Sequence, residues 1–297
     1  MQGTVDGFSY GLVTPVVACV MACLGGALGL RCTTRALLVA NSWRPGWLAL
    51  ASAAIGSGIW TMHFVAMTGF TVEEAPVHYD RPTTYVSLAV AIVMVGVGIF
   101  IVGYRGATGS ALFTGGTITG LGIATMHYLG MAGMRLNGTL EYDTLTVAAS
   151  VVIAVVAATA ALWAAGQVRG PLWSVGASLV MGLAVSGMHY TGMAAVSVHL
   201  HGTGGTPADG ESPAVLLAPM MVGPLTLLLL AGAVVLFDRQ MVLGGPDWAP
   251  AEHKPGVPAG ELVPHATGRP LSRTRRGPAR APHPGPARER LRAPQNR

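Results

Sequence analysis

Charged residues are scarce in this sequence. They make up only 10% of the 297 residues, whereas hydrophobic residues make up 51% and aromatic residues 6%. A soluble domain carries about 25% charged residues, so the composition excludes an ordinary soluble protein. The mean hydropathy of +0.52 favours a chain whose main solvent, and first expected partner, is the lipid bilayer.

Cysteine is scarce as well, with Cys19, Cys23 and Cys32 as the only three. They form no CxxC pair, and their number and spacing exclude a secreted disulfide framework. Cys19 and Cys23 lie four residues apart, on one face of a helix, where two thiolates could be soft metal ligands. Cysteine is also a small apolar filler of membrane helices, and we favour that interpretation.

The chain contains long apolar segments. A helix that crosses the hydrocarbon needs roughly 20 mainly apolar residues, and seven segments meet this requirement. The sequence therefore predicts an all-α membrane protein with seven transmembrane helices built from internal helical-hairpin repeats, within residues 8–237. The predicted spans are 8–30, 47–71, 83–103, 111–134, 144–166, 172–198 and 214–237. The first is too long for the apolar region of a signal peptide, and we expect it to be retained.

Arginine distinguishes the two sides of the predicted helices. Arg31, Arg35 and Arg44 follow the first span, Arg105 the third and Arg169 the fifth, whereas the opposite loops carry acidic residues and histidines. Short loops rich in Lys and Arg stay in the cytoplasm. We therefore expect a multi-pass protein of the cell membrane, with its N-terminus outside and its C-terminus in the cytoplasm.

Residues 244–297 differ in composition from the rest, being rich in Pro, Gly, Ala and Arg. Such a segment cannot bury enough apolar surface to offset its chain entropy, and the sequence predicts a disordered Pro/Arg-rich cytoplasmic tail. Because the net charge of +5 is concentrated in this tail, we expect no nucleic-acid partner. The tail is either solvated or attracted to anionic lipid head groups.

The chain contains one pattern three times. The pattern G-x-[GA]-[IV]-x-x-M-H-[FY]-x-[AG]-M occurs at 56–67, 120–131 and 182–193. Its histidines, His63, His127 and His189, recur once per helical hairpin, so each lies on an even-numbered span. Each lies about eight residues before the predicted outer end, roughly 12 Å below the outer surface at about 1.5 Å per residue. We expect the three imidazoles to converge.

Each of these histidines has a methionine at position −1 and another at +4. The six are Met62, Met67, Met126, Met131, Met188 and Met193. The +4 residue lies one turn nearer the outside on the same helix face, and the small residue at +3 lets that face approach another helix. Neutral imidazole with thioether sulfur suits copper, especially Cu(I). We expect a copper site formed by the three histidines and six methionines; zinc and haem iron stay open, as does a packing role in which each histidine only bonds a neighbouring helix.

At Met62-His63-Phe64, Met126-His127-Tyr128 and Met188-His189-Tyr190-Thr191 the chain resembles the MHYT domain, a bacterial integral membrane sensor module. The resemblance covers about residues 8–237. It implies a copper site near the outer face that senses oxygen, carbon monoxide or nitric oxide. Relatives fuse the module to cytoplasmic signalling domains, which implies a cytoplasmic signalling partner, since residues 244–297 are too short to form such a domain. Only the third copy spells the full tetrapeptide, so Met and His are the essential part.

Four functions are compatible with these features. The first is a sensor whose bound copper takes a diatomic gas as ligand. The second is a copper-handling or transport protein in which His78, His199 and His201 collect the metal, although the cytoplasmic halves of the helices show no polar pathway. The third is a structural membrane protein, and the fourth a copper oxidoreductase. No Ser-His-Asp arrangement, phosphate loop or carboxylate pair supports catalysis, and we expect the chain not to be an enzyme.

Overall fold

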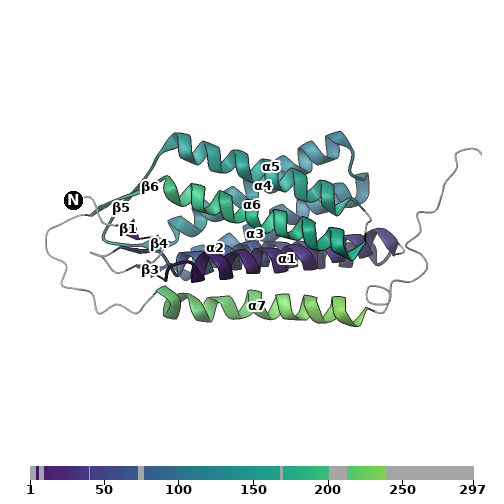
Figure 1. The fold of residues 1–297 in the computed structure, drawn as a ribbon, viewed down its shortest axis with the longest axis horizontal. Coiled ribbons are helices and arrows are strands. Elements are labelled where there is room, and N and C mark those ends of the chain that lie inside the picture. Colours follow the sequence, from purple (N-terminus) through teal and green to yellow (C-terminus); the bar gives the residue numbers. More distant parts are fainter. Residues whose placement is uncertain are drawn as a thin grey trace, which may run out of the picture. The chain divides into compact units, whose positions relative to one another are not determined.

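Seven long helices and three small sheets make up the computed structural model, which describes residues 5–6, 10–39, 41–72, 77–167, 170–200 and 213–238 (Figure 1). The helices are α1 (Val13–Leu38), α2 (Arg44–Met67), α3 (Arg81–Arg105), α4 (Gly109–Ala132), α5 (Thr144–Ala165), α6 (Pro171–Ala194) and α7 (Pro213–Phe237). The predicted tail, 244–297, lies outside the described residues, as do Arg169 and His201.

Six of the described helices are long and apolar enough to cross a membrane, which makes this a multi-pass membrane domain. The exception is α4, which has 24 residues but is rich in glycine and threonine. Of the six, α6 and α2 are the least apolar. The three helices with the repeated motif are thus the three least hydrophobic ones, because small residues serve their contacts with other helices. The predicted count of seven spans is not established by hydropathy.

The first helix differs most from its predicted range of 8–30. It begins at Val13 and ends at Leu38, so Arg31 and Arg35 lie within its last turns and not in a loop. A helix can continue past its apolar segment because long arginine side chains reach toward the head-group region. Arg44 begins α2 and Arg105 ends α3. All four arginines still lie at the same end of the helices, away from the strands.

The first six helices form a closed ring. Each of α2, α3, α4 and α5 packs against the helix before it and the helix after it, and α6 packs against α5 and α1. The last helix, α7, packs on the outside of this ring, against α2 and α1. The three motif helices alternate around the ring with α1, α3 and α5.

At the first glycine of each motif, the motif helix packs closely against another helix of the ring. A Cβ at Gly56 would lie 2.8 Å from the Cα of Ile92 in α3, and a Cβ at Gly120 would overlap the backbone of α5. The third such glycine, Gly182, lies against Cys23 of α1. In the third repeat α1 therefore fills the position that α3 and α5 fill in the first two. That position is closed to α7, although α7 follows α6 in the chain.

Short strands join each helix pair at one end of the ring. They are β1 (Val5–Asp6) with β2 (Thr71–Val72), β3 (His78–Tyr79) with β4 (Met134–Arg135), and β5 (Gly138–Tyr142) with β6 (Val196–Leu200). The strand before each odd-numbered helix of the ring pairs with the strand after the next helix, so the structural repeat is strand–helix–helix–strand. An all-α prediction missed the two-residue strands because they are too short to show alternation, whereas β5 and β6 do alternate and the start of β6 was included in the predicted span 172–198.

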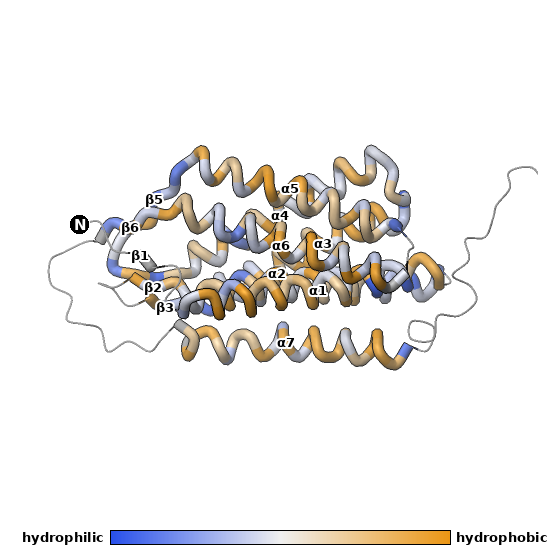
Figure 2. The backbone as a smooth tube through the Cα atoms, in the orientation of Figure 1, coloured by the Kyte–Doolittle hydropathy of each residue, from blue (hydrophilic) through white to orange (hydrophobic). Residues whose placement is uncertain are grey.

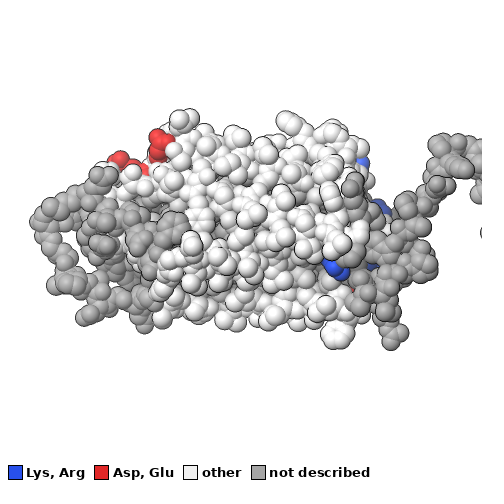
Figure 3. Space-filling model, viewed as in Figure 1, with Lys and Arg blue, Asp and Glu red and all other residues white. Residues whose placement is uncertain are grey.

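Charged side chains lie at the two ends of the helices, and the region between them is uncharged in the view of Figure 3. Four arginines and Asp238 lie at one end, while Asp80, Glu141 and Asp143 lie at the strand end with Arg81 and Arg135. Apolar residues dominate the middle (Figure 2), and many of them are exposed, Val93 and Leu183 by 60% and 64%. An exposed apolar belt between two charged ends is the surface that a bilayer covers.

Candidate metal centre

The three motif histidines meet at the centre of the ring, one from each of α2, α4 and α6. The Nδ1 of His63 lies 3.0 Å from that of His189 and 3.1 Å from that of His127, and the third pair lies 3.2 Å apart. All three side chains are buried, with at most 1% exposed. Their ring centroids are 4.9 to 5.0 Å apart and their planes cross at 77° to 89°. The structure thus brings together the three imidazoles in an approximately threefold-symmetric arrangement.

The histidines lie closer to the ends of their helices than the sequence predicted. The three helices end at Met67, Ala132 and Ala194, four or five residues beyond the histidine and not about eight. The distance along the helix axis is therefore about 6 to 8 Å. The difference arises because the chain leaves the helix early and continues into β2, β4 and β6.

Each of two histidine rings lies against the small residue at motif position +3 of the next motif helix. A Cβ on Gly130 would lie 2.5 Å from the Nε2 of His63, and a Cβ on Gly192 would lie 2.5 Å from the Nε2 of His127. The residue at this position in the first motif is Ala66, which is 3% exposed. The residue at +3 must therefore be small because a histidine from another repeat packs against it.

Aromatic residues of the motifs surround the triad. Each histidine packs edge-on against the aromatic residue that follows it, with centroid distances of 4.6 Å for Phe64, 4.8 Å for Tyr128 and 5.0 Å for Tyr190. A second tyrosine from the strand end packs on two of these, Tyr79 on Phe64 and Tyr142 on Tyr128. These edge-to-face contacts fix the planes of the imidazoles.

The residues at the last two positions of the tetrapeptide differ between copies, and so do their hydrogen bonds; that they are less essential than Met and His stays a prediction. The hydroxyl of Thr191 donates to the carbonyl of Gly187 in its own helix. The hydroxyl of Tyr128 forms a 2.6 Å hydrogen bond with Ser150 of α5. In the first repeat the aromatic residue is Phe64, and Trp60 instead donates to Ser87 of α3, at 3.0 Å. The first and second repeats thus use different hydrogen bonds to join a motif helix to a neighbouring helix.

The segments 77–80 and 140–143, which match each other in sequence, cap helices at the strand end. Asp80 accepts the backbone N–H of Thr83 at the start of α3, and Asp143 accepts that of Thr146 at the start of α5. The threonine hydroxyls donate to the same carboxylates. These hydrogen bonds stabilise the ionised form, and they lower the pKa of both aspartates from its ordinary value.

The methionines of the motifs belong to the packed interior. Met62, Met126 and Met188 are at most 1% exposed, as are Met67 and Met131, while Met193 is half-buried. Helix geometry places each +4 methionine one turn from its histidine on the same face and each −1 methionine about 100° round the helix. Their sulfur atoms as metal ligands therefore stay a prediction, whereas the convergence of the histidines is a feature of the structure.

Other candidate ligands lie apart from the triad. His78 is exposed on β3, and His199 on β6 lies 3.3 Å from the carboxylate of Glu141. Cys19 and Cys23 are free thiols on α1, beside α6. Among the described residues, His63, His127 and His189 form the cluster that could hold an ion.

The geometry of the triad suits a cation at its centre. Nitrogen atoms separated by these distances lie about 1.8 Å from the centre of their triangle, close to the roughly 2.0–2.1 Å of a zinc–imidazole bond. Because the Nδ1 of a neutral imidazole either donates or accepts, at most two of the three Nδ1–Nδ1 contacts can be hydrogen bonds at the same time. In addition, the buried Nε2 atoms of His63 and His127 have no hydrogen-bond partner. Hydrogen bonding between the histidines alone therefore leaves this cluster poorly satisfied.

Known proteins share this sequence pattern. The profile of the family described as a bacterial signalling protein N-terminal repeat, MHYT, matches residues 56–115, 120–178 and 182–242. The bifunctional diguanylate cyclase/cyclic di-GMP phosphodiesterase MucR of Pseudomonas aeruginosa is 34% identical over 238 residues, 78% of this chain and 35% of MucR. The cyclic di-GMP phosphodiesterase NbdA of the same organism is 34% identical over 228 residues, 72% of this chain and 28% of NbdA.

The signalling protein YkoW of Bacillus subtilis is 27% identical over 198 residues, 64% of this chain and 24% of YkoW. The chain thus spans about a third or less of the length of these relatives. No solved structure matches the chain. The three matched repeats each begin in a motif helix, and together they cover more than half of the sequence. With its three Met-His motifs on alternate helices of one ring, the chain belongs to the MHYT family of bacterial signalling proteins.

Proposed function

We propose that this chain is a membrane sensor module that binds one copper ion through His63, His127 and His189, and that a diatomic gas (oxygen, carbon monoxide or nitric oxide) is its ligand. The observation that carries the metal is the convergence of three buried Nδ1 atoms 3.0 to 3.2 Å apart. Bound copper would supply an open coordination position that can take a diatomic ligand. The methionines of the motifs, above all Met67, Met131 and Met193, would supply soft sulfur ligands beside it.

A packing role explains the triad less well than a metal does. Histidines that only join helices find a hydrogen-bond partner for each ring nitrogen, because a buried polar group without a partner costs free energy. Here the three Nδ1 atoms face one another, and at most two of the three contacts can be hydrogen bonds, because each Nδ1 either donates or accepts. A bound cation would be attracted by all three lone pairs and would fix one tautomer.

A transport role is also less well supported. On the side of the triad away from the strands, the residues one turn along each motif helix are Ile59, Ile123 and Val185, all buried. Copper that moved inward would have to leave its imidazole ligands for an aliphatic layer, which offers it no ligand. The site therefore suits a resident ion better than one in transit.

The signal is proposed to pass to a cytoplasmic partner through a module with seven spans and an outer N-terminus. The names of MucR and NbdA describe enzymes of cyclic di-GMP turnover, which makes a domain of that class the expected partner. The cluster of Arg31, Arg35, Arg44 and Arg105 away from the strands supports this orientation by the positive-inside rule. The copper site would then lie near the outer face.

Metal analysis of the purified full-length protein tests the proposal. Wild-type protein expressed with added copper should contain about one copper per chain, and replacement of any one histidine of the triad by Ala should remove most of it, because each supplies a third of the nitrogen ligands. His78→Ala and His199→Ala, at the strand end and outside the triad, are the matched controls and should keep their copper.

X-ray absorption at the copper edge then separates nitrogen from sulfur ligands, and tests the methionines. Thermal unfolding in the same membrane mimetic shows whether a variant lost copper or lost its fold. Equal copper in wild type and the triple histidine variant would reject the metal site and leave the packing role. Copper that binds without any spectral change under oxygen, carbon monoxide or nitric oxide would reject the sensing role alone.

A further inference from the structure

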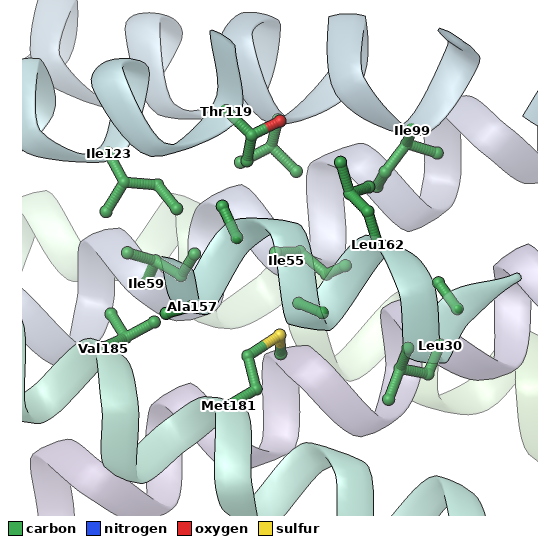
Figure 4. A pocket seen from close by; sticks show the side chains of 14 residues that line it. Leu30, Ile55, Ile59, Ile99, Thr119, Ile123, Ala157, Leu162, Met181 and Val185 are labelled. Carbon is green, nitrogen blue, oxygen red and sulfur yellow. The ribbon is translucent and has the colours of Figure 1, made fainter. Parts of the chain in front are cut away.

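An apolar cavity lies inside the ring (Figure 4). All six helices of the ring contribute to its wall. Its volume is about 30 Å³. A cavity needs roughly 10–15 Å³ to hold one water-sized group, so this one has room for about two, which is the size of a diatomic molecule.

The cavity is separated from the triad by one layer of aliphatic side chains. Ile59, Ile123 and Val185 line the cavity, and each precedes a histidine of the triad by four residues on the same helix. Four residues are one turn, or about 6 Å along the axis. Because the same motif position contributes from all three repeats, the cavity lies on the approximate threefold axis of the ring, and the triad lies on the same axis.

The wall of the cavity offers few hydrogen-bonding groups to water. Apart from Thr119 its lining side chains are aliphatic or thioether groups. The hydroxyl of Thr119 donates across to the carbonyl of Met94, at 3.4 Å, and so already has an acceptor. Apolar cavities of this kind stay dry and take up non-polar guests such as xenon.

The wall toward α5 is thin. Ala157, Ala158 and Ala161 of α5 line the cavity, and Ala157 and Ala161 are also partly exposed on the surface of the domain. A single layer of methyl groups therefore lies between the cavity and the outside of the ring. Non-polar diatomic molecules dissolve in the hydrocarbon of a bilayer, so the lipid would be the source of the guest.

We propose that this cavity is a binding site for a non-polar diatomic molecule, which enters from the bilayer beside α5 and is held one layer of side chains away from the histidine triad. The further role of the cavity as a reservoir for a gas ligand of bound copper rests on the proposed function. The binding of a non-polar guest in the cavity does not, because the aliphatic wall is present whether or not a metal binds.

Xenon is the probe, applied under pressure to crystals of the full-length, metal-free protein, with the anomalous difference map as readout. A xenon peak is expected among Ile59, Ile123 and Leu162. Ala158→Leu fills the cavity and should remove the peak. Ala160→Leu is the matched control on the lipid-facing side of the same helix, and it should leave the peak unchanged.

Leu162→Ala enlarges the same cavity and should strengthen the peak, which keeps the test informative if Ala158→Leu fails to fold. Absence of a xenon peak in the wild-type cavity, or a peak that Ala158→Leu leaves unchanged, would overturn the inference. Neither result would bear on copper content, which is measured separately. Conversely, a xenon peak in protein that never binds copper would uphold the cavity site while rejecting the proposed metal.

For copper-loaded protein, the rate of carbon monoxide rebinding after photolysis gives a second readout. The fast rebinding phase from a nearby reservoir should disappear in Ala158→Leu and persist in Ala160→Leu. Equal fast phases in the two variants would show that the cavity does not serve the triad.

Discussion

The Nε2 atom of His63 faces the Cα of Gly130, where a single added Cβ would approach it to 2.5 Å. His127 has the same relationship to Gly192. The first repeat thus depends on a residue of the second, and the second on a residue of the third. A glycine in one motif determines the position of a histidine in another.

Gly130→Ala and Gly192→Ala should therefore displace a histidine ring. Overpacking of this kind destabilises a core by roughly 1–3 kcal/mol, and we expect a lower thermal midpoint together with lower copper content. Gly187→Ala on α6 is the control, because a Cβ there meets nothing within 4 Å, and replacing Gly by Ala in a helix stabilises it by about 1 kcal/mol. If Gly130→Ala matched Gly187→Ala in both measurements, the seating role would be rejected.

Whether α4 crosses the membrane can be decided by labelling single cysteines. In a chain without the three native cysteines, Thr108→Cys lies just before α4 and Asn137→Cys lies beyond its other end, and both positions are exposed. Because α4 packs in the ring between α3 and α5, it should span, and in the proposed orientation an impermeant maleimide added to intact cells should label Asn137→Cys only. Labelling of both positions to the same extent would show that α4 does not span.

Acid should weaken the strand end of the domain through Asp80 and Asp143. Hydrogen bonds from the following threonines lower the pKa of each carboxyl below its ordinary value of 3.8. Their contribution to stability is therefore full above that value and is lost as the pH falls through the lower, folded-state pKa. The fall in thermal midpoint between pH 6 and pH 3 should be smaller in Asp80→Asn/Asp143→Asn, since Asn keeps a capping oxygen but does not titrate. A fall as large as that of wild type would assign acid sensitivity to other groups.

The end of α7 should depend on one ion pair. The Nε of Arg35 in α1 lies 2.9 Å from the carboxylate of Asp238, with 16% and 13% of the side chains exposed. Removal of one partner leaves the other charge partly buried, which costs roughly 1–3 kcal/mol. Protease cleavage just after Phe237 should therefore be faster in Asp238→Asn and in Arg35→Gln. The double variant should be little worse than either single one, whereas additive effects would show that the two side chains act independently.

The repeated motif was sufficient to predict that three histidines occupy matched positions on alternate helices. The spacing of His63, His127 and His189 carries this information, because each interval equals one helical hairpin. Family membership followed from the same residues, and the profile match supports it. Six of the seven helices were also predictable as membrane spans, since apolar segments of this length form helices in lipid, whereas the spanning of α4 stays a prediction.

Three features could not be predicted in this way. The ring position of α1 depends on the contact between Gly182 and Cys23, two residues 159 positions apart that no local pattern connects. The strand pairs depend on backbone hydrogen bonds between loops, for example between β5 and β6. The distance from the histidines to the ends of their helices was overestimated, in the first motif because residues 68–70 are apolar enough to resemble helix but form a turn and an irregular residue after Met67.

Closure of the ring through α1 and α6 has a consequence for biogenesis. The chain enters the membrane from its N-terminal end, so α1 is inserted long before α6, with which it must finally pack. Contacts between such distant segments form late, and the third histidine, His189, lies on the last helix to complete the ring. A half-inserted or misthreaded chain would therefore present at most two imidazoles to an ion. If copper binds as proposed, its retention would mark those molecules in which all six ring helices have been assembled.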